Sequence, residues 1–228
     1  DVCSSDLYAS AQRSRKVREG LKGRNTVTDV LYDAGFNSNS RFYESADQLL
    51  GMKPSDYKAG GTNTHIHFAV GQCSLGAILV AQSHRGVCAI LLGDEPDALV
   101  RDLQDQFPKA ELLGADPAFE QLVAQVVGFI EAPALGLDLP LDLRGTAFQE
   151  RVWQALRDIP VGSTASYAQI AERIGAPTSF RAVAQACGAN RLAVAIPCHR
   201  VVRSNGDLSG YRWGVERKRL LLERERDV

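Results

Sequence analysis

The 228-residue sequence predicts a mixed α/β (α+β) protein built from three parts. Residues 1–61 and 144–228 carry helical apolar patterns, whereas residues 62–143 combine short apolar runs typical of strands with amphipathic helices. The composition, 45% hydrophobic and 23% charged, is that of a globular protein. We therefore expect a small helical N-terminal region, a central α/β layer and a helical C-terminal domain.

The first part, residues 1–61, predicts two short helices joined by a tight turn. Thr26 and Asp29 resemble a capping box, and Ser38 can begin a second helix that Gly51 would stop. This pattern is a helix-turn-helix, although any helical hairpin would look similar. The AGF…SRFY…GMKPSDY run is similar to the second helix-turn-helix of AraC-type regulators. Such units carry two of these motifs, so we expect a truncated unit here.

The second part, residues 62–143, predicts a sheet with helices. GAILVAQS and GVCAILLG form a hairpin around the turn-like His84-Arg85-Gly86. Amphipathic helices fit Glu95 to Gln106 and Pro117 to Ile130, and LDLPLDL at 137–143 is interpreted as another strand. No catalytic motif falls in this layer, so we interpret its thiols, Cys73 and Cys88, as core or surface groups.

The third part, residues 144–228, predicts a second helix-turn-helix. Thr146 can cap a helix with an apolar face of Phe148, Val152, Trp153 and Leu156. A short helix is expected over Ser166 to Ile174, and Ser179 opens another with Arg181 outside. The inward residues of that helix are expected to be Val183, Ala184 and Cys187. Its many small residues allow close approach to a neighbouring helix or to a nucleic-acid groove.

The charge and cysteine content set limits on function. The net charge is −1, but basic residues cluster from Arg13 to Arg24 and from Arg181 to Lys218, and phosphate binding depends on such local patches. Five cysteines without a CxxC pair favour a reducing cytosol over a disulfide framework. No apolar run has membrane-spanning length and no histidines and cysteines stand at zinc-finger spacing, so we expect no membrane partner and no metal.

The segment IPCHRVV places Cys198 between a proline and a histidine. Pro197 disfavours a regular helix, so we expect a buried extended segment in which Cys198 and His199 point to opposite faces. Contact between them would need a turn or a bridging water. On this local evidence Cys198 is either an inert buried thiol or an activated thiolate.

Residues 165–225 resemble the active-site half of the O6-alkylguanine-DNA alkyltransferases. The resemblance rests on PCHRV, on an asparagine eight residues before the cysteine, and on RAV at the start of a helix. It extends from about Ser10 onward and is strongest to the Ada-type adaptive-response members. These residues include neither the zinc-bearing domain nor the first helix-turn-helix of that type.

The resemblance implies a ribonuclease-H-like layer at 62–143 and a winged-helix-like DNA-binding and active-site domain at 144–228. It also implies a reaction: one alkyl group moves from O6 of guanine, and from O4 of thymine, in double-stranded DNA to Cys198. Because the product is a thioether, each molecule would act once. The resemblance implies a monomer without a cofactor. Together with the cysteine content, it leads us to expect a bacterial cytoplasmic protein.

The resemblance also implies roles for individual residues. His199 would act as a base through a water, oriented by Glu225 or, as a second choice, Glu223. Asn190 would support the active-site turn. Tyr167 would crowd the 3′ phosphate, help to flip the nucleotide out, and donate a proton to the leaving guanine.

Further implied residues contact DNA or line the base pocket. Arg181 would fill the space left by the flipped nucleotide, with the recognition helix in the minor groove. The implied DNA-binding set is Tyr167, Ser179, Arg181, Ala182, Gln185 and Arg200. The implied pocket comprises Cys198, Val201 and a lid of Tyr211, Arg212 and Trp213. Because the family often has a small hydroxyl residue at Arg212, the range of alkyl groups stays open, and a narrow pocket favouring methyl fits.

Three alternatives compete with repair. A truncated AraC-type transcription regulator of the alkylation response is suggested by residues 10–60, although half a unit should bind operators poorly. Alkyltransferase-like proteins bind the same lesions without transfer, but they lack the cysteine that Cys198 supplies. A Cys–His hydrolase would need an oxyanion-hole motif, which does not accompany the pair.

Overall fold

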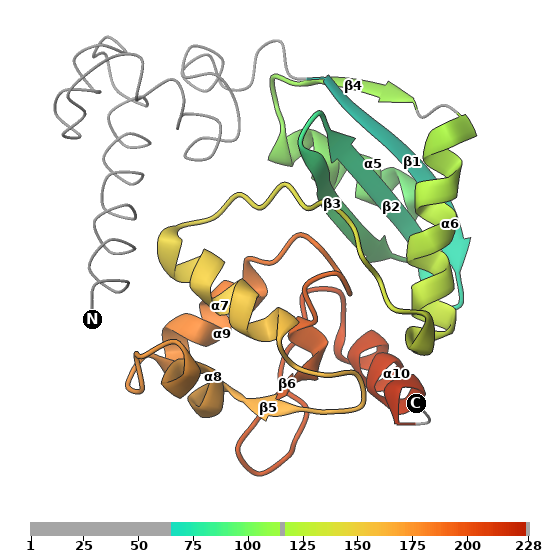
Figure 1. Ribbon diagram of the computed structural model, residues 1–228. Coiled ribbons are helices and arrows are strands. Elements are labelled where there is room, and N and C mark those ends of the chain that lie inside the picture. Colours follow the sequence, from blue (N-terminus) through green and yellow to red (C-terminus); the bar gives the residue numbers. More distant parts are fainter. Residues whose placement is uncertain (1–64, 115–116, 227–228) are drawn as a thin grey trace, which may run out of the picture.

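The computed structural model describes residues 65–114 and 117–226 (Figure 1). The predicted helix-turn-helix of residues 1–61 lies outside them. The described strands are β1 (His65–Cys73), β2 (Gly76–Ser83), β3 (Gly86–Gly93), β4 (Glu111–Gly114), β5 (Ala165–Ser166) and β6 (Val201–Val202). The helices are α5 (Pro96–Gln106), α6 (Pro117–Glu131), α7 (Ala147–Arg157), α8 (Tyr167–Arg173), α9 (Phe180–Gly188) and α10 (Val215–Glu225), with 3-10 turns at Pro133–Leu135 and Cys198–Arg200.

Four strands form one sheet in the order β3-β2-β1-β4. β1, β2 and β3 are successive antiparallel neighbours, and β4 joins β1 in parallel after the crossover through α5. The β2–β3 hairpin turns at the predicted place. Gly86 has a φ of +140°, a conformation that L side chains rarely adopt, and an added Cβ would collide with the Pro140 carbonyl oxygen.

Both faces of β2 and β3 are covered, which explains their unbroken apolar sequences. Leu79 and Leu91 pack with Leu103 of α5 on one face. Ile78 and Ile90 belong to the larger cluster on the opposite face, which includes residues of α6 and of the C-terminal domain (Figure 1). A strand buried on both faces loses the polar alternation of a half-exposed strand.

The prediction of a strand at LDLPLDL is wrong. Only one isolated bridge forms, between Val87 and Leu141. The Val87 N–H donates to the Pro140 carbonyl and the Asp142 N–H donates to the Val87 carbonyl, each at 2.8 Å. Pro140 has no N–H of its own, so it cannot continue a ladder.

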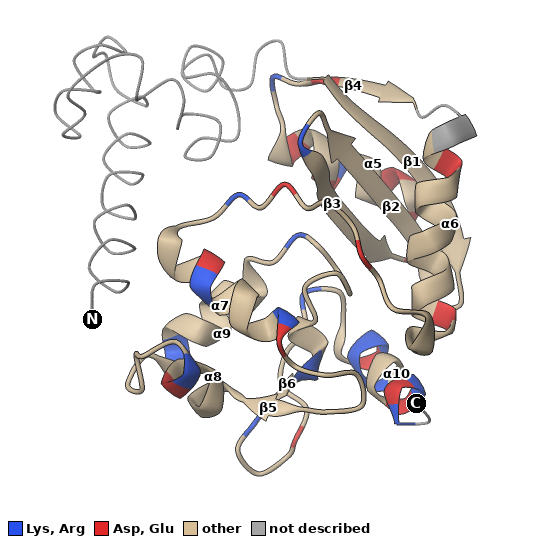
Figure 2. Cartoon of the chain, viewed as in Figure 1, with Lys and Arg blue, Asp and Glu red and all other residues tan. Residues whose placement is uncertain are grey.

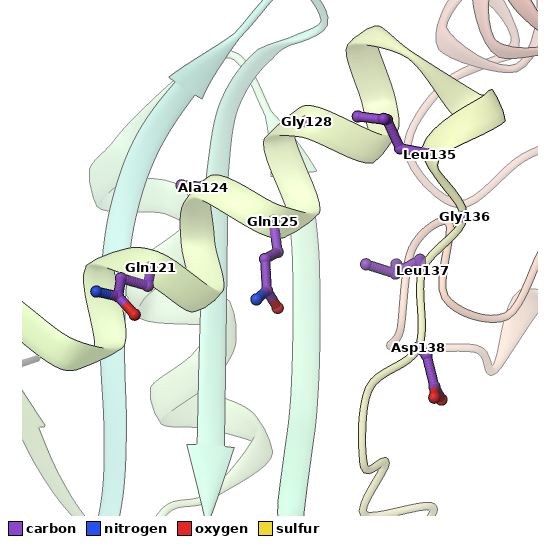
Figure 3. A pocket seen from close by; sticks show the side chains of 8 residues that line it. All are labelled: Gln121, Ala124, Gln125, Gly128, Leu135, Gly136, Leu137 and Asp138. Atoms are coloured by element: carbon purple, nitrogen blue, oxygen red, sulfur yellow. The ribbon is translucent and has the colours of Figure 1, made fainter.

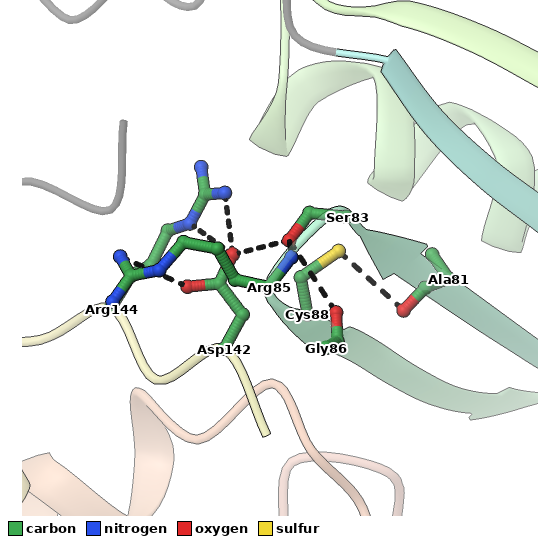
Figure 4. Close-up of polar contacts among 7 residues, drawn as sticks. All are labelled: Ala81, Ser83, Arg85, Gly86, Cys88, Asp142 and Arg144. Atoms are coloured by element: carbon green, nitrogen blue, oxygen red, sulfur yellow. Dashed lines mark hydrogen bonds and ion pairs between the residues drawn. The ribbon is translucent and has the colours of Figure 1, made fainter. Parts of the chain in front are cut away.

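A buried carboxylate holds this linker against the hairpin turn (Figure 4). Asp142 accepts a 2.7 Å hydrogen bond from the Ser83 hydroxyl and a 2.6 Å hydrogen bond from Arg144 Nη2. The Arg85 guanidinium lies 3.8 Å from its other oxygen. The link between the two halves of the molecule is therefore anchored by charge-assisted contacts.

The helices of the C-terminal domain begin where the sequence predicts. Thr146 and Ser166 each accept a hydrogen bond from the backbone N–H three residues on, in complete capping boxes. On α9, Val183 and Cys187 are buried as predicted, but Ala184 is exposed and Ala186 is buried. The spacing i, i+3, i+4 from Val183 selects 186 and 187, so Ala184 falls on the outer side.

The C-terminal domain is attached to the sheet through β3. The Ile90 N–H donates to the Arg191 carbonyl at 2.9 Å, and the Ala193 N–H donates to the Ile90 carbonyl at 3.0 Å. A second attachment comes from α10, where Arg217 donates to the carbonyl of Leu75, in the turn between β1 and β2, at 2.8 Å. The segment leading to Cys198 is thus hydrogen-bonded to the edge strand β3 of the sheet.

Candidate active site

Cys198 begins a single 3-10 turn, Cys198–Arg200, that leads directly into β6. The prediction of a fully extended segment is therefore wrong at this point, because the Arg200 N–H closes a turn on the Pro197 carbonyl at 3.0 Å. The segment is buried as predicted, with Cys198 4% exposed and His199 fully enclosed. β6 pairs with β5 in parallel, which places the turn next to the start of α8.

Asn190 holds the segment that leads to Cys198 and also contacts the thiol. Its amide nitrogen lies 3.2 Å from Cys198 Sγ and 2.9 Å from the Ile196 carbonyl oxygen, and its carbonyl accepts the Leu192 N–H at 2.9 Å. Between them, Val194 has a φ of +59°, which is strained for a β-branched residue. Asn190 therefore holds a turn that the backbone alone would disfavour.

His199, Glu225 and Arg200 form one buried cluster. His199 Nε2 lies 2.8 Å from Glu225 Oε1. The Arg200 guanidinium donates to both Glu225 oxygens at 2.9 Å and to the Ile159 carbonyl at 2.6 Å. Arg200 was expected on the DNA surface, and that prediction is wrong because its donors are used inside the protein. Glu223, the second choice, instead pairs with Arg219 on the exposed side of α10.

The protonation states of this cluster follow from its contacts. Burial opposes ionisation of Glu225, but the hydrogen bonds from His199 and Arg200 lower its pKa to about 2. Burial lowers the pKa of His199, so the imidazole is neutral at pH 7. Because the Glu225 carboxylate can only accept, Nε2 carries the proton and Nδ1 keeps its lone pair. That Nδ1 is buried and has no hydrogen-bond partner within the described part of the chain.

The thiol of Cys198 is protonated at rest. Burial raises its pKa to about 11, while the Asn190 amide and the positive charge of Lys218 act in the opposite direction. A base is therefore needed to form the thiolate that nucleophilic chemistry requires. The neutral Nδ1 of His199 can serve as that base.

Two residues of the site have no counterpart in the sequence predictions. Lys218 is fully buried, and its ammonium donates to the Val201 carbonyl at 2.6 Å and to the Ser209 hydroxyl at 2.9 Å. The Ser209 hydroxyl lies 2.6 Å from the Tyr167 hydroxyl. A signal for Lys218 exists in the sequence: it shares the i, i+3, i+4, i+7 stripe of α10 with Leu221, Leu222 and Glu225, all buried.

Of the three predicted lid residues, Tyr211 and Trp213 pack against other aromatic rings, whereas Arg212 lies at the surface. Tyr211 meets His199 edge-on at 6.3 Å between ring centroids and Trp213 at 5.1 Å. Trp213 is buried in the main core. Arg212 is directed to the surface, where it lies 3.5 Å from Asp102 of α5.

The predicted DNA-binding residues of this region are Ser179, which precedes α9, and three residues along α9. Arg181 and Gln185 are exposed, and Ser179 and Ala182 are partly exposed. The basic cluster from Arg181 to Lys218 does not form one continuous patch, because Arg200 and Lys218 are buried. Figure 2 shows Lys and Arg residues spread over several elements of the C-terminal domain, among them α7, α8 and α10. Arg181 and Arg203 are among its residues that face solvent.

Residues 65–114 and 117–226 show no group of three or more metal-ligating side chains, and no helix among them is long and apolar enough to cross a membrane. One surface hollow lies between α6 and the 135–138 segment (Figure 3). Its lining includes Gln121, Gln125 and Leu135, and it shares no residue with the cluster around Cys198.

In a comparison with known proteins, two ranges of this chain match family models. The model described as 6-O-methylguanine DNA methyltransferase, ribonuclease-like domain, matches residues 66–143, and the model described as 6-O-methylguanine DNA methyltransferase, DNA binding domain, matches residues 147–227. An inducible methylated-DNA–protein-cysteine methyltransferase of Bacillus subtilis is 36% identical over 148 residues, which cover 83% of its length and 64% of this chain. The chain belongs to the 6-O-methylguanine DNA methyltransferase family.

Other members of this family extend the comparison. The Escherichia coli bifunctional transcriptional activator/DNA repair enzyme Ada is 51% identical over 218 residues, or 96% of this chain. The chain spans 62% of that relative's length. The crystal structure of Mycobacterium tuberculosis OGT in complex with DNA superposes with a TM-score of 0.58 at 36% identity, covering 72% of this chain and 93% of the other. The prediction of the family is confirmed, and the predicted mixed α/β fold class is confirmed for the residues that the structure describes.

Proposed function

We propose that this chain repairs DNA by transferring a methyl or other alkyl group from O6 of guanine to Cys198, once per molecule. One observation carries the proposal: in a member of this family, a buried thiol sits beside a neutral histidine whose Nε2–H is committed to a carboxylate. The free Nδ1 faces the interior with its lone pair available. In such a pair the histidine can accept the thiol proton, which leaves the nucleophilic thiolate.

The proposed chemistry follows from these contacts. A water between Cys198 and His199 Nδ1 carries the thiol proton to the imidazole. The resulting imidazolium is stabilised by the Glu225 carboxylate 2.8 Å from Nε2. The thiolate displaces the alkyl carbon from O6 and forms a thioether, which no nearby group can cleave, so each molecule acts once.

The substrate is proposed to be double-stranded DNA that carries O6-alkylguanine or, in second place, O4-alkylthymine. The reacting atom lies inside the base stack, so the nucleotide must rotate out of the duplex. Arg181, exposed at the start of α9, is proposed to fill the vacated space. Ser179, Ala182 and Gln185 of the same region would contact the groove, and Tyr211 with the carbonyl of Val201 would line the base pocket. We further propose that the protein acts as a monomer in the cytoplasm, without a cofactor.

Mass spectrometry tests the proposal directly. After incubation with a duplex containing one O6-methylguanine, the peptide with Cys198 should gain one methyl group as the lesion disappears in equal amount. Cys198→Ser should leave the lesion intact. Repeated turnover, or a methyl group on Cys73 or Cys88, would contradict the proposal.

A further inference from the structure

The hydroxyl of Ser209 connects a buried ammonium to the tyrosine of the active site. Lys218 Nζ donates to Ser209 Oγ at 2.9 Å, and Ser209 Oγ lies 2.6 Å from the Tyr167 hydroxyl. Lys218 is fully buried and Ser209 is 9% exposed, so water does not compete for these contacts. Tyr167 packs against the core cluster that contains Cys198.

The donors of Lys218 set the direction of this chain of hydrogen bonds. An ammonium has three N–H donors and no acceptor. The three donors of Lys218 go to the Val201 carbonyl at 2.6 Å, the Ser209 hydroxyl at 2.9 Å and the Ser209 carbonyl at 3.4 Å, all of which are neutral oxygens. Ser209 Oγ must therefore accept from Lys218, and its single proton is left to be donated onward.

That proton has two possible acceptors. The Tyr167 hydroxyl is 2.6 Å away, whereas the Val201 carbonyl is 3.5 Å away and already accepts from Lys218. Hydroxyl hydrogen bonds are strongest near 2.7 Å and weak at 3.5 Å. When Ser209 donates to the Tyr167 oxygen, the O–H of Tyr167 is not needed for that hydrogen bond. Tyr167 can then donate its proton to a bound base.

We propose that Ser209, held by Lys218, is a positioning residue that turns Tyr167 into a hydrogen-bond and proton donor toward the leaving base. This inference rests on the proposed function. As the bond from Cys198 Sγ to the alkyl carbon forms, the carbon–O6 bond breaks and its electron pair stays with guanine. Guanine takes the phenol proton of Tyr167. The Ser209 hydroxyl and the ammonium behind it stabilise the phenolate until water returns a proton, while the thiol proton has gone to His199.

The test compares two alkyl donors that differ in what leaves. Guanine in duplex DNA needs a proton as it departs, whereas the iodide of methyl iodide does not. Ser209→Ala should slow methylation of Cys198 by O6-methylguanine DNA by about tenfold, the effect of one charge-assisted hydrogen bond. Its reaction with methyl iodide, read from the same peptide mass, should stay within about twofold of the parent rate.

Matched variants separate positioning from folding. Ser209→Thr keeps the hydroxyl and should restore the DNA reaction, and Ser163→Ala, at an exposed serine, should leave both reactions unchanged. In a Tyr167→Phe background, Ser209→Ala should have no further effect on the DNA reaction. The inference would be overturned if Ser209→Ala slowed the reaction with both alkyl donors equally or with neither. It would also be overturned if the effects of Ser209→Ala and Tyr167→Phe were additive in the double variant.

The parent protein distinguishes this inference from the proposed function. If the unaltered chain methylates Cys198 from DNA, the function stands and the variants decide the role of Ser209. If the unaltered chain takes a methyl group from methyl iodide but not from O6-methylguanine DNA, the proposed function fails, and the inference fails with it.

Discussion

His199 Nε2 lies 2.8 Å from Glu225 Oε1, and both side chains are almost completely removed from solvent. Glu225 is the last residue of α10, 26 positions after His199 in the chain. The carboxylate also accepts two hydrogen bonds from Arg200. The contact therefore fixes the tautomer of His199 and at the same time attaches the final helix to the active-site turn.

Glu225→Gln should slow alkyl transfer and destabilise the fold. The amide cannot compensate Arg200, and breaking a buried ion pair costs about 3–5 kcal/mol. We expect at least a tenfold lower single-turnover rate with O6-methylguanine DNA, from loss of the acceptor that stabilises imidazolium. Glu223→Gln is the matched control on the same helix, because Glu223 pairs with Arg219 at the surface. Equal effects of the two substitutions would contradict the assignment.

Asn190→Ala should be strongly destabilising. It removes donors to the Ile196 carbonyl and to Cys198 Sγ and the acceptor of the Leu192 N–H, all buried. Each buried polar group left without a partner costs about 1–3 kcal/mol, so we expect a loss of about 3 kcal/mol in urea unfolding. Asn205→Ala, at an exposed loop asparagine, should change stability by less than about 0.5 kcal/mol. A small loss at Asn190 would show that the strained turn at Val194 holds without it.

Arg181→Ala should impair repair of duplex DNA and spare the chemistry. Without the side chain that fills the gap, rotating the nucleotide out of the stack loses a few kcal/mol, so the duplex rate should fall on the order of a hundredfold. The rate with free O6-methylguanine base should stay the same. Arg219→Ala is a suitable control, because Arg219 pairs with Glu216 and Glu223 on α10. A parallel fall with free base would place Arg181 in the reaction itself.

The stability of the protein should fall as the pH drops below 6.5. Burial lowers the pKa of His199 below its unfolded value of 6.5, so near and below that pH the unfolded chain binds more protons than the folded chain. The free energy of unfolding then decreases with falling pH, by about 1.4 kcal/mol per pH unit for one proton. Glu225 adds a second loss below its unfolded value of 4.5, down to its folded pKa of about 2. Urea unfolding at pH 7.5, 6.0 and 5.0 measures the first window.

His199→Asn is the control for that pH dependence. It removes the titrating group, so the decline between pH 6.5 and 5 should become shallower than in the parent protein. An unchanged slope would assign the decline to another group. A stability that rises on acidification would contradict the burial of a neutral imidazole.

Local sequence signals determined most of the secondary structure. The capping residues Thr146 and Ser166, the glycine of the hairpin turn and the apolar runs of β2 and β3 act over a few residues, so their effects are readable in order along the chain. The same locality explains the error at LDLPLDL. Alternating apolar residues indicate a strand, but only a neighbouring edge with free donors and acceptors can complete one.

The active-site chemistry depended on the tertiary structure. The PCHRV motif led to the proposal that Cys198 is the reactive residue only through resemblance, since a cysteine beside a histidine is compatible with an inert thiol. The three-dimensional fold decided that His199 meets Glu225, that Arg200 turns inward to the same carboxylate, and that a lysine lies buried behind Ser209. These contacts join residues 9 to 26 positions apart, and they form only because α10 packs against the active-site turn. The sequence, through its resemblance, led to the proposal that Cys198 is the nucleophile. Burial and long-range packing decided which groups surround its thiol.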